Sequence, residues 1–394
     1  MTEIGDVETR YLELALRLRR LEPYLVECYT GPGSLADAVE SEPPPTARAL
    51  RQSAVELRGA VDDAVAELDR RAWLVAQLEG LQTALTHLGG EHVPYRTLVR
   101  RCHGVDPKLV SDEQFAAGHD LLAGVLPGNG DVRRRAQEWT ETQLVAPDLL
   151  LAGLAALAVE LQRRTRELIG LPEGEEVTFE LVRDRAWWGN ADYLGDLRTH
   201  IRINADRRTA SFRLLELVAH EAYPGHHTEH VCKDTDLIAR LGRIELGVYL
   251  YPTPQVVVAE GIAELGLDVL LGADADTVGA QCLRPLGIAY DFETAQVFRR
   301  AEELLLPLRA NIAMLLDDGR SADEMRSYAR RWMLEDDEFV DGFVESLVDD
   351  PWPAYESCYA ESLPLCRRFV GGELDRFGRL LREQLTPGDL DGRR

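Results

Sequence analysis

Residues 220–230 read His-Glu-Ala-Tyr-Pro-Gly-His-His-Thr-Glu-His, a segment that an ideal helix cannot accommodate. Pro224 lacks the backbone N–H that a helix interior needs and collides with the preceding turn. Gly225 tolerates backbone dihedrals that other residues avoid. Apolar side chains at helical spacing precede the segment over 211–219. We therefore expect a helix over 209–230 with a local bulge at the Pro-Gly pair.

The histidines of this segment favour a metal site. In the common zinc pattern, two histidines four residues apart share one helical face, and a glutamate follows the first of them. Here the fourth position after His220 is proline, and His226 would lie roughly 9 Å further along an ideal helix. A bulge would bring His226 or His227 back toward His220, with Glu221 beside them. The alternative is a helix that ends at Pro-Gly with solvated histidines.

A third ligand is expected on a second apolar helix over 255–271. Glu260, Glu264 and Asp268 follow one another at steps of four, which stacks three carboxylates on one face. Like charges in this arrangement repel unless a cation or histidines compensate them. The pattern therefore indicates a metal ligand accompanied by acids that orient the histidines. An acidic, solvated face is the alternative.

The motif His-Glu-Ala-Tyr-Pro-Gly-His-His at 220–227, followed by Glu-Gly-x-Ala at 260–263, resembles domain-of-unknown-function family 885. This helical bacterial family is distantly similar to glutamate-zincin metallopeptidases such as carboxypeptidase Taq and the thimet oligopeptidases. The resemblance implies a zinc ion held by His220, His226 and Glu260, with Glu221 as the general base. His227 and Glu264 are then expected to orient the ligands or to act as alternative ligands.

The chain departs from the family at positions near the expected site. Members usually have Trp-Ala-Leu-Tyr after Glu-Gly, whereas residues 262–265 read Ile-Ala-Glu-Leu. Members usually have Leu-Gln after the histidines, whereas this chain has Thr228-Glu229. Substrate preference therefore cannot be carried over from the resemblance.

Hydrolysis of an amide at such a site also needs a donor to the tetrahedral oxyanion. A tyrosine hydroxyl or a histidine commonly serves, and Tyr290 and His230 are our candidates for a catalytic role. Tyr249, Tyr355 and Tyr359 are further candidates. Each is equally compatible with ordinary packing.

Two segments before the histidines alternate in the manner of strands, 177–182 and 199–204. We expect a small antiparallel pair joined by a turn-rich connection over 185–193. An exposed strand edge can bind an extended peptide, which makes Thr199, Ile201 and Ile203 candidate substrate-binding residues. The alternative is a hairpin that only packs.

The remaining pattern is mainly helical, and the length favours two lobes, 1–174 and a metal-binding lobe 175–394. The resemblance implies that this helical architecture is zincin-like. Helical periodicity extends over 8–27, 46–69, 71–88, 111–124, 131–143, 146–168, 209–230, 255–271, 290–317, 322–333, 336–349 and 354–384.

Composition narrows the partners and the setting. The chain has 44 basic and 68 acidic residues, a net charge of −24, which argues against nucleic acid and anionic membranes. Six scattered cysteines without C-x-x-C spacing suit reduced thiols, and the N-terminus lacks signal-peptide features. We therefore expect a cytoplasmic protein. Oligomeric state is left open.

Three functions are compatible with these patterns. The first is a zinc-dependent hydrolase of peptide or amide bonds acting on small substrates. The second keeps the metal but cleaves a non-peptide C–N or ester bond of a specialised metabolite. The third is a helical metal-binding protein without catalysis, against which the intact Glu221 argues.

Overall fold

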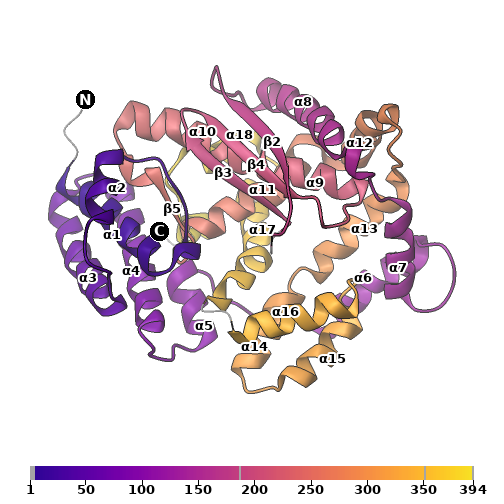
Figure 1. Cartoon of the computed structure of the whole chain (residues 1–394), viewed down its shortest axis with the longest axis horizontal. Helices are drawn as coiled ribbons and strands as arrows, with labels where there is room; N and C mark the ends of the chain where they lie inside the picture. The colour runs from indigo at the N-terminus through magenta and orange to yellow at the C-terminus, as the bar shows by residue number, and fades with distance from the viewer. Residues whose placement is uncertain (1–4, 186–187, 350–351, 393–394) are drawn as a thin grey trace.

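The computed structural model describes residues 5–185, 188–349 and 352–392, and the fold is mainly helical as predicted, with two small sheets (Figure 1). The first half of the chain forms α1 (Asp6–Leu21), α2 (Gly33–Glu40), α3 (Ala47–Ala64), α4 (Leu68–Leu88), α5 (Tyr95–Leu98), α6 (Asp112–Val125), α7 (Val132–Thr142) and α8 (Leu150–Leu168). The second half forms α9 (Ser211–Glu221), α10 (His226–Lys233), α11 (Gln255–Leu271), α12 (Ala275–Leu283), α13 (Phe292–Leu305), α14 (Leu308–Asp317), α15 (Ala322–Trp332), α16 (Asp337–Asp349), α17 (Glu356–Val370), α18 (Leu374–Arg382) and α19 (Pro387–Leu390). The strands are β1 (Val26–Tyr29), β2 (Glu176–Val182), β3 (Gly189–Gly195), β4 (Arg198–Asn204) and β5 (Val248–Leu250).

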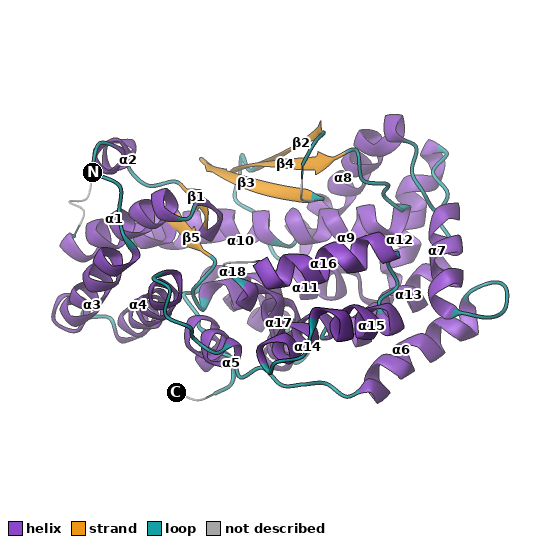
Figure 2. Cartoon of the chain, turned by 60° about the horizontal axis from the view of Figure 1, so that its bottom comes forward, coloured by secondary structure: helices purple, strands orange, loops and turns teal. Residues whose placement is uncertain are grey.

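Helix α11 lies in the middle of the molecule. Its residues are apolar nearly all the way round, a composition typical of a buried helix, and most of them are buried. It packs against α17 on one side and against α9 and α10 on the other. Figure 2 shows α9 and α10 following each other beneath the three-stranded sheet. The predicted helix over 255–271 is thus confirmed at both ends.

The three-stranded sheet has the order β2-β4-β3. Our predicted antiparallel pair is wrong, because 176–182 and 198–204 pair in parallel. The connection between them supplies the missing strand β3, which pairs antiparallel with β4 and makes β4 central. Positions 186 and 187 of that connection lie outside the described residues. The sequence pattern missed β3 because Gly-Asn-Ala-Asp at its start is typical of a turn.

A strand near the N-terminus pairs with a strand from the second half of the chain. The predicted helix over 8–27 ends at Leu21, and residues 26–29 instead form β1, which pairs antiparallel with β5. Helices α6 and α8 pack against α13 and α9 respectively. The lobe boundary near residue 174 stays a prediction, and elements on its two sides are in extensive contact.

Two other predicted helices are interrupted in the structure. The stretch 290–317 divides at Pro307 into α13 and α14, and 354–384 divides at Gly371-Gly372 into α17 and α18. Proline removes an interior hydrogen bond, and both glycines adopt positive φ angles, which suit a helix end.

The six cysteines are free thiols. Within the described ranges, no helix combines the length and apolar character that a bilayer span requires.

Candidate metal centre

The turn between α9 and α10 brings the two ends of the histidine motif together. Helix α9 ends at Glu221 and α10 begins at His226, so the segment is a full break rather than the predicted bulge. The Tyr223–Pro224 peptide bond is cis. A Cβ atom at Gly225 would lie 1.8 Å from the carbonyl oxygen of His220. Only glycine fits here, because the chain folds back tightly onto the last turn of α9.

His220, His226 and Glu260 form a compact group that could hold one metal ion. The two histidine Nε2 atoms are 3.2 Å apart, and the Glu260 oxygens lie 3.5 Å from His220 and 3.8 Å from His226. Tetrahedral zinc with bonds of 2.0–2.1 Å separates its ligand atoms by about 3.3 Å. The spacing and the N/O donor set therefore fit zinc, with His226 from α10 and Glu260 from α11 completing the group.

The electrostatics of the group favour a bound cation. The Oε2 atom of Glu260 is buried without a hydrogen-bond partner, and burial raises the pKa of Glu260 to about 7. Burial lowers the pKa of His226 well below its usual value, which keeps a lone pair free for a metal. Burial also opposes charge on His220, but the carboxylates of Glu264, Glu221 and Glu260 outweigh it and raise its pKa to about 10. The site thus attracts positive charge.

Glu264 and Glu221 are the two other acidic residues that the sequence assigned to this site. Glu264, one turn after Glu260 on α11, places a carboxylate oxygen 3.4 Å from Nδ1 of His220, the nitrogen that faces away from the group. Such a contact fixes the orientation of a ligand ring. Glu221 is the last residue of α9, and burial raises the pKa of its carboxyl.

His220, Glu221 and Glu264 all line a cleft of about 930 Å³. The volume is in the upper part of the range for small-molecule sites. Of the three candidate ligands, His220 lines this cleft, with Glu221 beside it in the chain.

Two tyrosines lie beside Glu260: Tyr355, the residue before α17, and Tyr359 in its first turn. The Tyr355 hydroxyl donates a 2.7 Å hydrogen bond to Glu260 Oε1, and the Tyr359 hydroxyl lies 3.4 Å from that of Tyr355. Gly261 permits this arrangement, because a Cβ there would lie 2.3 Å from the Sγ of Cys366 on α17. Both tyrosines were among the sequence candidates, and Tyr359 also lines the cleft.

His227 points away from the metal group into a closed polar cluster. Its Nε2 lies 3.0 Å from Glu175, and its Nδ1 lies 2.7 Å from the Thr199 hydroxyl. Glu175 also accepts hydrogen bonds from Tyr223, Gln162 and Arg166. Both ring nitrogens of His227 are therefore engaged, and the structure brings His226 rather than His227 to the metal group. Sequence reasoning missed this cluster, because Glu175 is 52 residues from His227.

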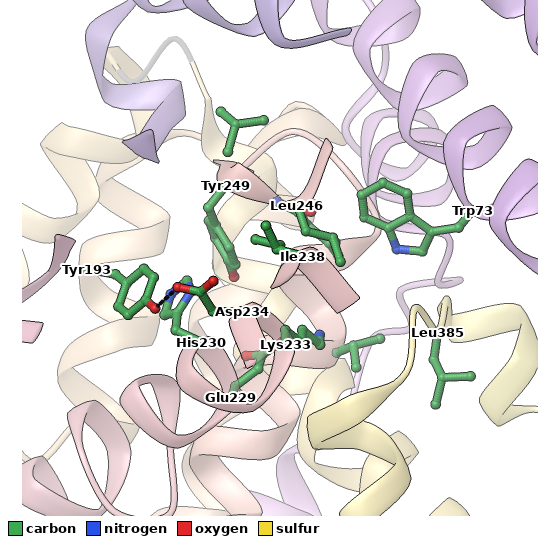
Figure 3. Close-up of a pocket in the computed structure, with 13 residues that line it drawn as sticks. Trp73, Tyr193, Glu229, His230, Lys233, Asp234, Ile238, Leu246, Tyr249 and Leu385 are labelled. Carbon is green, nitrogen blue, oxygen red and sulfur yellow. Dashed lines mark hydrogen bonds and ion pairs between the residues drawn. The ribbon is translucent and has the colours of Figure 1, made fainter. Parts of the chain in front are cut away.

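His230 lies one turn after His226, beside a small cavity of about 30 Å³ (Figure 3). Its ring stacks on Tyr193 at 4.7 Å and contacts Tyr249 at 6.0 Å. Burial lowers its pKa to about 3, so the ring is neutral. The catalytic role of His230 stays a prediction, since its ring contacts are with tyrosines rather than with the metal group.

Four other candidates lie away from the metal group. The Tyr290 hydroxyl donates a hydrogen bond to Asp276, and the Tyr290 side chain packs against Gly279 of α12. This hydrogen bond satisfies the buried hydroxyl, so no catalytic role is needed to explain its presence. Thr199, Ile201 and Ile203 are buried in β4. Both edges of that strand are paired, so β4 is not the exposed strand edge that the prediction supposed. Contact of these three residues with substrate stays a prediction.

Comparisons with known proteins support the fold alone. No family model and no curated protein matches the chain, so the resemblance to family 885 stays a prediction. One solved structure, described as "the putative lipoprotein from Colwellia psychrerythraea", superposes with a TM-score of 0.54 and 16% identity. The match covers 91% of this chain and 71% of that one. At this identity the likeness concerns architecture and not activity.

Proposed function

We propose that this protein is a zinc-dependent hydrolase of peptide or amide bonds in small substrates. The observation that carries the proposal is the juxtaposition of His220, His226 and Glu260 with Glu221 at the wall of a substrate-sized cleft. A structural zinc site is commonly closed by four protein ligands, whereas a catalytic one has three and keeps a position open. The group here has three protein ligands and a carboxylate base next to them.

The chemistry follows from these roles. A zinc ion in the group would acidify a water molecule and polarise the scissile carbonyl. Glu221 takes a proton from the attacking water, whose oxygen bonds to the carbonyl carbon. When the C–N bond breaks, Glu221 passes that proton to the leaving amine. The raised pKa of Glu221 suits a group that must both accept and donate a proton near neutral pH.

Two tyrosine hydroxyls, of Tyr355 just before α17 and of Tyr359 within it, add further polar groups near the candidate metal ligands. Tyr355 holds Glu260 in place through its hydroxyl, and Tyr359 presents a second hydroxyl at the cleft. We infer that Tyr359 is the better candidate for a donor to the developing oxyanion, in place of Tyr290. The cytoplasmic location expected from the sequence remains part of this proposal.

Metal content and turnover test the proposal together. Wild-type protein purified without a histidine tag and supplied with zinc should bind one zinc per chain, and Glu260→Ala should lose it. Glu221→Gln should keep the zinc and lose about 10²–10⁴-fold of turnover on a library of small peptides and amides. Full activity in Glu221→Gln would refute the assignment of the base. Bound zinc without turnover of any peptide or amide would point to a non-catalytic site or to another bond class.

A further inference from the structure

Two adjacent helices line the cleft with apolar side chains next to the metal group. On α11, Ala263 and Leu267 line the cleft on either side of Glu264, and on α17 Leu363 lines it. Helices α11 and α17 pack against each other (Figure 1). Residues four apart share one face of a helix. The apolar stripe therefore begins beside Glu264, whose carboxylate lies 3.4 Å from His220.

Leu267 and Leu363 lie deep in the wall of the cleft. They are only 6% and 5% exposed, although both line it. An apolar group that lies on them moves out of water onto an apolar surface, which favours binding in proportion to the area buried. Further apolar side chains line the same cleft from the ends of α13 and α14 and from the segment after α15: Leu305, Leu306, Leu308, Met333 and Leu334.

An ion cluster ends the apolar stripe on both helices. Arg367, one turn after Leu363 on α17, donates a 2.9 Å hydrogen bond to Asp268 of α11. It also donates to Glu303 of α13 at 3.1 Å. These three residues, the Asp268–Arg367–Glu303 triad, line the cleft with side chains that are 41–45% exposed. An apolar chain that covered the triad would remove water from three charged groups, which is costly.

The spacing along α11 sets the length of the apolar stretch. Glu264, next to the metal group, and Asp268, in the triad, are four residues apart, which is about 6 Å along the helix axis. Leu267 lies between them and faces the cleft. One side chain of the size of leucine, methionine or phenylalanine fits this stretch, whereas a longer chain meets the triad.

The charges of the cleft favour neither sign of substrate. Six arginines, among them Arg207 and Arg208, and seven carboxylates line it. The two signs are nearly balanced, and the arginine at the end of the apolar stripe, Arg367, already contacts two carboxylates. Complementarity of charge therefore discriminates little between substrates. Selection depends instead on the apolar surface and on its length.

We propose that Leu267 and Leu363 form a subsite for an apolar side chain of the substrate residue at the scissile amide, and that the Asp268–Arg367–Glu303 triad limits the length of that side chain. This inference rests on the proposed hydrolase function and names its substrate class. The substrates are amides and short peptides of apolar residues of the size of leucine, methionine or phenylalanine.

Alkyl hydroxamates test the subsite without turnover, because the hydroxamate binds zinc and the alkyl group contacts the cleft. Calorimetry with zinc-loaded protein compares acetyl, isocaproyl and octanoyl hydroxamates. We expect the leucine-sized isocaproyl probe to bind wild type at least about tenfold more tightly than the acetyl probe, since each buried methylene contributes about fourfold. The octanoyl probe should gain less than about threefold more, because its end meets the triad, whereas burial of the whole chain would add more than about tenfold.

Two leucines of α17 supply a matched pair of variants. Leu363→Ala should reduce the preference for isocaproyl over acetyl by at least about threefold, with zinc content and acetyl binding unchanged. Leu365 is 3% exposed on the same helix and lies outside the lining of the cleft, as the described residues define it. Leu365→Ala should therefore keep the wild-type preference. Leu267→Ala tests the same subsite from α11 if Leu363→Ala does not fold, and thermal unfolding identifies the folded variants.

The outcomes separate the two proposals. If the three probes bind wild type alike, or if Leu363→Ala and Leu267→Ala keep the preference, the subsite is refuted and the hydrolase proposal still stands. If affinity rises about fourfold with every methylene up to the octanoyl probe, the triad does not limit the side chain. If zinc-loaded wild type binds no hydroxamate, the hydrolase proposal fails and this inference fails with it.

Discussion

Helix α10 contributes one histidine to each of two His–Glu–Tyr groups, and the groups differ in how their polar atoms are satisfied. In the closed group, His227 and Tyr223 both hydrogen bond to Glu175, and the Thr199 hydroxyl pairs with the second ring nitrogen of His227. In the metal group, two histidine nitrogens face each other and Glu260 keeps an unpartnered oxygen. Successive helical residues point about 100° apart, so adjacent histidines enter different environments.

The pKa values of the two carboxyl groups, Glu175 and Glu260, shift in opposite directions. Burial works to raise the pKa of Glu175, but the hydrogen bonds from His227, Tyr223 and Gln162 outweigh it and hold the pKa below its usual value. Burial raises the pKa of Glu260, and the single bond from Tyr355 offsets only part of the effect. A fully satisfied group stabilises the fold, whereas an incompletely satisfied one is available to a ligand.

Replacing each histidine in turn gives the largest expected contrast. His227→Ala removes one hydrogen-bond partner from each of buried Glu175 and Thr199, so the free energy of unfolding should fall by about 1–3 kcal/mol. His226→Ala should abolish zinc binding and change the metal-free stability much less. Chemical denaturation of the metal-free variants measures the change in stability, and metal analysis measures zinc binding. Equal loss of stability in the two variants would contradict the distinction.

The turn between the two groups can be broken at Gly225. In Gly225→Ala the new Cβ meets the backbone of His220, so we expect a loss of about 1–3 kcal/mol in stability together with weaker zinc binding. Gly59→Ala in α3 is the matched control, because no atom lies within 4 Å of the added Cβ. That control should be neutral or stabilising by up to about 1 kcal/mol. Thermal unfolding and zinc titration report both effects.

Tyr355→Phe sharpens the comparison at the metal group. Loss of the hydroxyl removes the hydrogen bond that orients Glu260, and zinc affinity should fall by about 10–100-fold. Tyr359→Phe is the control, since that hydroxyl contacts Tyr355 rather than a ligand. Competition with a zinc chelator measures both affinities. An unchanged affinity in Tyr355→Phe would show that zinc binding by Glu260 does not depend on the Tyr355 hydroxyl.

The smallest expected effect is a dependence of stability on pH at the closed group. The folded pKa of Glu175 is depressed, so its contribution to stability is present above pH 4.5, the usual glutamate value, and is lost as the pH falls below it. Unfolding free energies measured in denaturant between pH 7 and pH 3.5 should decline less steeply in Glu175→Gln. Identical slopes in the wild type and in Glu175→Gln would show that the Glu175 carboxylate does not cause this pH dependence.

The sequence by itself determined the elements that carry the metal group. Helical periodicity located α11, and the step of four between Glu260 and Glu264 placed one carboxylate in the candidate metal group and the next beside His220. Pro224-Gly225 indicated that the helix had to be interrupted. These features are local, because periodicity and turn chemistry depend on neighbours in the chain.

Tertiary structure decided what the sequence left open. Which histidine joined the metal group depended on Glu175 and on the central strand β4, and the order of that sheet followed from β3, whose residues are typical of a turn. Strand β1 joined the second half of the chain only because it pairs with β5, more than two hundred residues away. Contacts between distant segments are set by packing of the whole core, and no local pattern encodes them.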